Sequence, residues 1–208
     1  MDGAAEMKKV LFTQRVEIVA SYGERRDCAD QNITRFIGEC GFLPIPVPNV
    51  PEIAHAMVND MDLAGMVFSG GNNLVSLGGD APERDETERL LLETAIGRGI
   101  PVYGFCRGMQ FILDYYKYPL TKIEGHVATK HLIVEVMNNR HVNSFHNYGC
   151  LQSDFIKEGP LEIVAASEDG VVEAIRHKKL PIFGTMWHPE RNYPFESYDL
   201  KMVKELFN

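Results

Sequence analysis

Cysteine pairs, long apolar runs and an excess of basic residues are all missing from this 208-residue chain. Its four cysteines are widely spread without a Cys-x-x-Cys pair, which argues against a disulfide framework and suits a reducing cytoplasm. No segment approaches the ~18 consecutive apolar residues of a membrane helix. The net charge of −8 argues against a broad surface for a nucleic-acid polymer, but it is compatible with a local basic pocket for a phosphorylated small molecule. We therefore expect a cytoplasmic protein whose partner is a small molecule.

The first residues do not have the form of a secretion signal. MDGAAEMKKVLF places acidic residues ahead of an apolar segment that is too short for one. We expect Met7 to be the natural start and residues 1–6 to be an addition or a disordered segment. The rest of the chain has no internal repeat, low-complexity tract or linker, so residues 1–208 are predicted to form a single domain.

Strand-like and helix-like segments alternate over the first 120 residues. Apolar patterning predicts buried strands at 8–16, 63–71 and 100–105, an extended Pro-rich segment near 43–49, and helices at 27–42, 51–61, 81–99 and 107–116. This alternation is typical of a parallel sheet covered by helices on both faces. The later segments 131–137, 162–167, 171–177 and 181–188 are strand-like with short connections and predict a mixed or antiparallel extension of that sheet. With a last helix at 198–208, the fold class is α/β, a three-layer sandwich with a mostly parallel central sheet.

The clearest functional signal is VYGFCRGMQ, residues 102–110, which places Cys106 between Gly104 and Gly108 where a strand meets a helix. This is the logic of a nucleophile elbow, in which glycines permit a sharp turn that exposes the nucleophile. The start of the helix favours a thiolate, and the backbone N–H of Arg107 is placed to stabilise an oxyanion. The alternative is that Cys106 is a small residue of the core.

Two further segments supply the groups that a thiol nucleophile needs. WHPE places His188 and Glu190 two residues apart in an extended segment, on the same side, so that the carboxylate can orient the imidazole as a base for Cys106. FSGG ends a predicted parallel strand, and Gly70 and Gly71 can turn an N–H toward the same oxyanion. The alternatives are an ordinary surface turn at His-Pro-Glu and a simple turn at the glycines.

Taken together, these elements resemble the class I glutamine amidotransferase superfamily. Its signatures are an oxyanion-strand glycine pair, a G-x-C-x-G elbow and a terminal H-P-E, in that chain order, and the resemblance covers residues 8–208. It implies a flavodoxin-like fold with an antiparallel extension and a triad of Cys106, His188 and Glu190. It also implies a glutamyl thioester that water hydrolyses.

Within the superfamily, the chain is similar to the γ-glutamyl hydrolase branch (peptidase C26-like), which includes γ-glutamyl-γ-aminobutyrate hydrolases. The features that carry this similarity are TQR (13–15), GERRD (23–27), ERDETE (83–88), CRGMQ (106–110) and VNSFHN (142–147). Arg107 fits this branch, because amidotransferase subunits commonly have an apolar residue there.

In that branch, Gln110 and the segment 143–147 help to hold the glutamyl head group, and the resemblance carries this role to Gln110, Asn143, Ser144 and His146. The chain departs from the branch at residues 112–122, where a Gly-Gly turn is usual, and at Asn147, where a second histidine is common. Both departures lie near the departing amine, so the identity of the leaving group stays open.

Arginines near the end of the first strand suggest what the leaving group carries. Arg15, Arg25 and Arg26 can clamp a phosphate or carboxylate at the ligand-binding edge of a parallel sheet. With the short loops, this resembles γ-glutamyl-CDP-amidate hydrolases of capsular phosphoramidate synthesis, which release glutamate from a nucleotide-linked amidate. The alternative is that neighbouring charges form ion pairs that brace loops, namely Arg26–Asp27 and Arg84–Asp85.

Three other hypotheses compete with a γ-glutamyl hydrolase. The first is a glutaminase subunit that delivers ammonia to a synthetase, and the second is a binding module that has lost the chemistry, although all three triad residues are present. The third is a metal site. The pairs His126–His131 and His141–His146 are five residues apart, a poor fit to one helix face, and no cysteine pair joins them. We expect neither a metal nor another cofactor, and the sequence does not indicate an oligomeric state.

Overall fold

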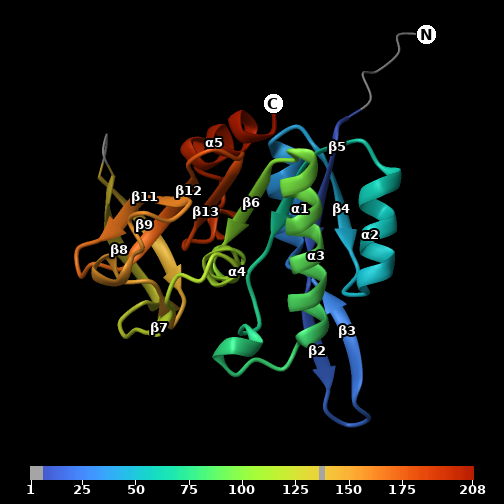
Figure 1. The fold of residues 1–208 in the computed structure, drawn as a ribbon, viewed down its shortest axis with the longest axis horizontal. Helices are drawn as coiled ribbons and strands as arrows, with labels where there is room; N and C mark the ends of the chain where they lie inside the picture. Colours follow the sequence, from blue (N-terminus) through green and yellow to red (C-terminus); the bar gives the residue numbers. More distant parts are fainter. Residues whose placement is uncertain (1–6, 136–138) are drawn as a thin grey trace.

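The computed structural model describes residues 7–135 and 139–208 and contains a nine-stranded mixed sheet (Figure 1). One half is parallel and consists, in spatial order, of β4 (Leu43–Val47), β1 (Lys9–Thr13), β5 (Leu63–Phe68), β6 (Val102–Phe105) and β13 (Ile182–Thr185). The sheet continues with the antiparallel strands β12 (Val172–His177), β11 (Leu161–Ser167), β8 (Val127–Glu135) and β9 (Arg140–Phe145). The predicted antiparallel extension is therefore confirmed, and residues 136–137 of the strand predicted there lie outside the described residues.

Helices cover both faces of the parallel half. Leu11 and Val102 belong to an apolar cluster with the helices α2 (Pro51–Asp60), α3 (Pro82–Arg98) and α4 (Arg107–Tyr115). Their strand neighbours Phe12 and Tyr103 point the other way, toward α1 (Gln31–Glu39) and α5 (Ser197–Phe207). This alternation, a consequence of the two-residue period of a strand, confirms the predicted three-layer α/β sandwich.

The helix limits follow from local signals in the sequence. The side chain of Asp30 accepts a hydrogen bond from the backbone N–H of Asn32 and thereby caps α1. Pro82 opens α3, and Gly99 ends it with a left-handed φ of 67°. The helix predicted at 81–99 is confirmed, whereas the one predicted at 27–42 begins later, at Gln31, because residues before it belong to a hairpin.

That hairpin was not predicted. The strand expected at 8–16 ends at Thr13, and β2 (Arg15–Val19) pairs with β3 (Glu24–Cys28) as a separate two-stranded sheet. It projects beyond the carboxyl ends of the parallel strands (Figure 1). Most of its side chains are exposed, so its sequence lacks the apolar alternation by which a half-buried strand is recognised.

The strand before His188 joins the two halves of the sheet. β13 pairs in parallel with β6, with Gly184 opposite Gly104, and antiparallel with β12, which agrees with the predicted mixed extension. Its continuous apolar run PIFGTMW is typical of a buried parallel strand.

Beyond the main sheet, the short strands β7 (Thr121–Lys122) and β10 (Tyr148–Gly149) pair with each other. Among the described residues, no helix is both long and apolar enough to span a bilayer.

Close packing of α4 on β5 gives a first prediction. A Cβ on Gly108 would lie 2.0 Å from the carbonyl oxygen of Phe68, which is backbone and has little freedom to move. Because overpacking costs about 1–3 kcal/mol and more where backbone must shift, Gly108→Ala should lower the free energy of unfolding by about 3 kcal/mol in urea denaturation. The control is Gly97→Ala in α3, where nothing lies within 4 Å and the change should be neutral or slightly stabilising. Equal stability of the two variants would contradict this packing.

Candidate active site

The candidate site lies where three neighbouring parallel strands end. β5 leads to Gly70, β6 leads to Cys106 and β13 leads to His188. Because the carboxyl ends of parallel strands meet at one edge of a sheet, residues far apart in the chain come together there. The placement of β13 beside β6 is therefore what brings His188 to Cys106.

The elbow at Cys106 has an unusual backbone. Its φ of 52° and ψ of −111° lie outside the common regions for a residue with a side chain. The backbone N–H of Cys106 donates to the carbonyl of Thr185 at 2.7 Å, which anchors the turn to β13. A Cβ on Gly104 would lie 2.7 Å from the carbonyl carbon of Gly108, so the glycines permit the close approach of strand and helix. The turn predicted from G-x-C-x-G is thus present.

His188 and Glu190 form a buried pair. The Nδ1 of His188 lies 2.7 Å from the Oε1 of Glu190, and both side chains are only 4% exposed. Burial lowers the pKa of His188, but Cys106 and Glu190 outweigh it and raise the pKa to about 10, so that the imidazolium is stabilised. The other nitrogen, Nε2, makes no hydrogen bond to any described residue. A Cβ on Gly70 would lie 2.9 Å from Cε1 of His188 and 3.6 Å from Cβ of Cys106, so the three residues share one small space.

The loop after β5 is held in place by Arg84. The guanidinium of Arg84 donates to the carbonyls of Ser69 and Gly71, each at 2.7 Å. In a planar trans peptide the N–H points opposite to the C=O, so the N–H of Gly70 faces away from Arg84. In the described part of the chain the N–H groups of Gly70 and Gly71 make no hydrogen bond. This supports their predicted role as oxyanion donors, together with the N–H of Arg107 at the start of α4.

A buried ionic network joins this loop to the elbow. Glu88 is fully buried and accepts hydrogen bonds from Thr13 at 2.8 Å, from Arg84 at 3.1 Å and from Arg107. Arg107 also pairs with Asp85. Burial raises the pKa of Glu88, but Arg107 and Arg84 outweigh it, and the pKa is lowered from its ordinary value. Sequence reasoning used only the backbone of Arg107 and missed this role of its side chain.

Two ion pairs predicted as loop braces do not form. Arg84 binds Glu88, one helical turn further along α3, rather than its neighbour Asp85. Side chains four residues apart share a helix face, whereas adjacent ones point in different directions. Arg26 and Asp27 likewise each bind other partners.

The three arginines predicted to clamp an anion lie on the strands of the hairpin, but they do not converge on one site. Arg25 forms an ion pair with Glu83 at 2.5 Å, and Arg26 forms one with Glu24 at 2.6 Å. Of these three arginines, only Arg15 lines the cavity beside the candidate site. The clamp of three arginines is therefore not assembled as predicted.

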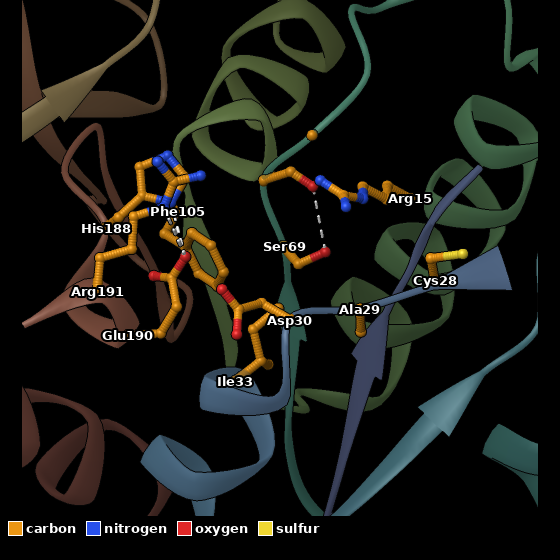
Figure 2. Close-up of a pocket in the computed structure, with 12 residues that line it drawn as sticks. Arg15, Cys28, Ala29, Asp30, Ile33, Ser69, Phe105, His188, Glu190 and Arg191 are labelled. Atoms are coloured by element: carbon orange, nitrogen blue, oxygen red, sulfur yellow. Dashed lines mark hydrogen bonds and ion pairs between the residues drawn. The ribbon is translucent and has the colours of Figure 1, made fainter. Parts of the chain in front are cut away.

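The cavity itself lies next to His188 and has a volume of about 150 Å³. Arg15 and Arg191 stand on opposite sides of it (Figure 2), and Gly70 and Asp30 also contribute to its wall. Both arginine side chains are partly exposed, at 49% and 39%, and each has a carboxylate neighbour, Glu17 at 2.6 Å from Arg15 and Glu190 at 3.8 Å from Arg191. Sequence reasoning missed Arg191, although its position directly after His-Pro-Glu marked it as a neighbour of the triad.

Asn143 holds the backbone of His188. Its side-chain amide donates to the carbonyl of His188 and accepts from the N–H of His188, both at 2.8 Å. It also donates to Asn192 at 3.2 Å. These contacts make Asn143 a positioning residue for His188, and its contact with a glutamyl head group stays a prediction.

The other predicted head-group residues have protein partners. Gln110 and His146 both approach the carbonyl of Tyr148, at 2.9 and 3.1 Å, and Ser144 donates to the carbonyl of His126 at 2.7 Å. All three side chains are buried, and none lines the cavity that contains Arg15. Their contact with substrate also stays a prediction.

Comparison with known proteins links this geometry to one family. The family described as glutamine amidotransferase class-I matches residues 26–198. A γ-glutamyl-CDP-amidate hydrolase from Campylobacter jejuni is 30% identical over 200 residues, which cover 95% of this chain and 96% of that protein. A carbamoyl phosphate synthase small chain from Staphylococcus epidermidis is 28% identical over 187 residues, covering 84% of this chain and 48% of that protein. A crystal structure described as a GMP synthase subunit from Thermoplasma acidophilum has the same fold, with a TM-score of 0.72 and 18% identity, and covers 98% of this chain and 94% of that one.

The thiols should differ in reactivity. Burial raises the pKa of Cys40 to about 12 and of Cys150 to about 11, and it also raises the pKa of Cys28. Cys106 instead lies at the start of α4 and shares a small space with the imidazole of His188, a setting typical of reactive cysteines. Iodoacetamide should therefore label Cys106 first, as measured by peptide mass spectrometry. Earlier labelling of any other cysteine would contradict this assignment.

Removing the carboxylate of Glu88, the centre of this network, should lower the free energy of unfolding. Breaking a buried ion pair from one side costs about 3–5 kcal/mol, so Glu88→Gln should lower the free energy of unfolding by that amount in urea denaturation. The control is Glu86→Gln on the exposed face of the same helix, with an expected change of less than about 0.5 kcal/mol. If Glu88→Gln does not fold, Asp85→Asn, which removes only the outer partner of Arg107, should show a smaller loss. A fully stable Glu88→Gln variant would show that the network is dispensable.

Proposed function

Because the chain belongs to the class I glutamine amidotransferase family, we propose that it hydrolyses the γ-glutamyl amide bond of a small molecule through a thioester on Cys106. The observation that carries this proposal is the convergence of Cys106, the His188–Glu190 pair and Gly70 at one edge of the sheet. A strained elbow, a base with its orienting carboxylate and free N–H donors are the parts that acyl transfer requires.

The first half of the reaction forms the thioester. His188, stabilised as an imidazolium, holds the proton of the Cys106 thiol on Nε2, and the sulfur attacks the γ-carbonyl carbon of the substrate. The carbonyl oxygen becomes an oxyanion, which the N–H groups of Gly70 and Arg107 stabilise. As the tetrahedral intermediate collapses, the C–N bond breaks and the imidazolium of His188 gives its proton to the departing nitrogen.

The second half consumes one water. Nε2 of His188 takes a proton from the water while the water oxygen attacks the thioester carbon. Collapse of the second tetrahedral intermediate breaks the C–S bond, releases glutamate and restores the starting state of Cys106 and His188. Glu190 keeps the imidazole oriented throughout and stabilises its cationic form.

The arginines point to an anionic leaving group. Because His188 protonates the departing nitrogen, the leaving group lies on the side of His188, and this is where Arg15 and Arg191 face the cavity. A volume of about 150 Å³ suits a phosphoryl group rather than a whole nucleotide, whose remainder would extend over the surface. The substrate we favour is γ-glutamyl-CDP-amidate, which would give glutamate and a nucleotide phosphoramidate for capsule synthesis. The similarity to the Campylobacter jejuni hydrolase supports this choice.

Two other substrates are competing candidates. A γ-glutamyl-γ-aminobutyrate substrate would offer a carboxylate, which the same arginines can bind. Glutamine, with ammonia passed to a synthetase, is favoured by the similarity to carbamoyl phosphate synthase small chains.

Glutamate release from γ-glutamyl-CDP-amidate, γ-glutamyl-γ-aminobutyrate and glutamine distinguishes these candidates. We expect the highest kcat/KM for the first and almost no turnover by Cys106→Ala. Loss of a charge-assisted contact should raise KM for the nucleotide substrate about 10-fold in Arg15→Ala and in Arg191→Ala, with a smaller change for glutamine. Arg26→Ala, whose guanidinium is paired outside the cavity, is the matched control and should behave as wild type.

The outcomes separate the parts of the proposal. Faster turnover of the aminobutyrate substrate would refute the nucleotide assignment, and faster turnover of glutamine would favour the ammonia-delivering subunit. Activity retained in Cys106→Ala would overturn the mechanism for all three substrates.

A further inference from the structure

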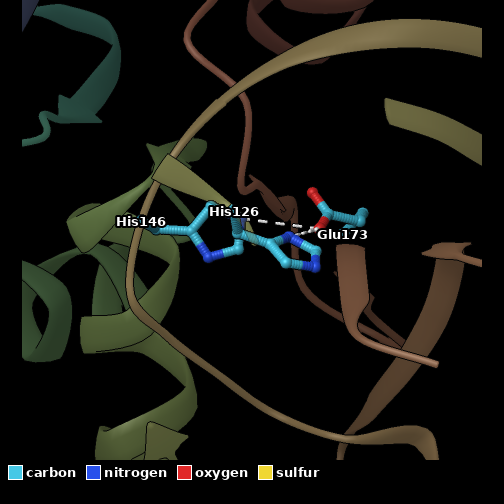
Figure 3. Close-up of side chains that lie close together, drawn as sticks. All are labelled: His126, His146 and Glu173. Carbon is cyan, nitrogen blue, oxygen red and sulfur yellow. Dashed lines mark ion pairs between the residues drawn. The ribbon is translucent and has the colours of Figure 1, made fainter. Parts of the chain in front are cut away.

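Three histidines surround one buried carboxylate in the antiparallel extension. Glu173 lies on β12 and is fully buried. Its Oε1 is 3.3 Å from Nδ1 of His126, 3.2 Å from Nε2 of His131 and 3.5 Å from Nε2 of His146. In Figure 3 the imidazoles of His126 and His146 both connect to the carboxylate by dashed lines. The cluster thus joins the start of β8, β8 itself, the end of β9 and β12.

These contacts are not ordinary hydrogen bonds. Within the described residues, both oxygens of Glu173 and the inward nitrogens of the three histidines lack a hydrogen-bond partner of acceptable geometry. Burying polar atoms without partners costs free energy, and a group left in this state in a native fold calls for an explanation such as a bound ion.

In His126 and His146, one ring nitrogen faces away from Glu173 and has a partner of its own, which leaves the other ring nitrogen facing the carboxylate. Nε2 of His126 lies 2.9 Å from a carboxylate oxygen of Asp169, and Nδ1 of His146 lies 3.1 Å from the carbonyl of Tyr148. Each outward N–H donates to its acceptor, which leaves a lone pair on the inward nitrogen. A histidine that donates from one ring nitrogen to a carboxylate or carbonyl and presents the other is the usual arrangement around a metal ion.

The spacing agrees with one ion at the centre. Bonds of about 2.0–2.1 Å in a tetrahedral site place the ligand atoms about 3.3 Å apart, close to the 3.3 and 3.5 Å that separate Glu173 from His126 and His146. The inward atoms of His126, His146 and Glu173 all lie within 4.8 Å of one another. We propose that His126, His146 and Glu173 bind a divalent transition-metal ion of the Zn²⁺ type.

Three protein ligands would leave the fourth position of a tetrahedral site to a water molecule. The ion would fasten β8, β9 and β12 together behind the segment that carries Asn143. The proposal is independent of the chemistry assigned to Cys106. It also corrects the sequence argument against a metal, which tested the five-residue spacing of His126 and His131 on a helix, whereas residues 127–135 form a strand.

Cobalt binding tests this site without reference to activity. Untagged protein is freed of metal with a chelator and titrated with Co²⁺, whose visible absorption is intense in tetrahedral sites, and Zn²⁺ is then added as a competitor. We expect one ion per chain, intense bands, their loss on adding Zn²⁺ and a higher Tm for the loaded protein. His146→Ala should weaken binding at least 100-fold, and Asp169→Asn, which weakens the outer partner of His126, should weaken it about 10–100-fold.

The matched control is His141→Ala, which removes an exposed histidine from β9 and should bind Co²⁺ within twofold of wild type. Asp169 is partly exposed, so its variant is expected to fold, and circular dichroism checks that both variants fold. Absence of one-to-one binding, weak bands of an octahedral ion, or equal affinity of folded His146→Ala and His141→Ala would overturn the proposal and leave protonated histidines as the partners of Glu173.

Discussion

One buried carboxylate, Glu88, connects the two halves of the candidate site. It binds Arg107, the first residue of the elbow helix, and Arg84, which fixes the carbonyls of the loop that carries Gly70. A lone carboxylate in the interior would carry a large desolvation penalty, and two guanidinium groups with the Thr13 hydroxyl offset it. A single ionic network therefore holds both the helix that follows Cys106 and the loop that carries Gly70, so a change at one of them is expected to alter the other.

The second constraint is the packing of the strands around the elbow. Cys106 keeps a strained backbone because its N–H is bonded to β13 and because Gly104 and Gly108 let the strand and the helix approach closely. The same strand β13 carries His188 to the site, and Asn143 from β9 fixes the His188 backbone on both sides. The antiparallel extension thus contributes to the candidate site by positioning His188, and a metal ion at Glu173 would strengthen that contribution.

Local patterns in the sequence were sufficient for the alternating elements, the elbow and the His188–Glu190 pair, because each depends on neighbours within a few residues. The hairpin at residues 15–28 was missed, since its exposed, charged strands lack apolar alternation. Contacts between side chains that are far apart in the sequence could not be predicted either. Nothing local indicates that Arg84 binds Glu88 instead of Asp85, that Arg25 turns to Glu83, or that histidines on different strands meet at Glu173. These pairings depend on tertiary packing, which a single sequence does not specify residue by residue.

The account depends on a covalent glutamyl intermediate at Cys106, and acid quenching tests this directly. Wild-type protein is mixed with γ-glutamyl-CDP-amidate, quenched within milliseconds to seconds, digested at low pH and examined by peptide mass spectrometry. The account predicts that the peptide containing Cys106 gains the mass of one glutamyl group, that hydroxylamine removes it, and that the adduct decays as glutamate appears. If glutamate is released without any adduct on Cys106 at any time, or if the adduct is on another residue, the proposed thioester mechanism is wrong.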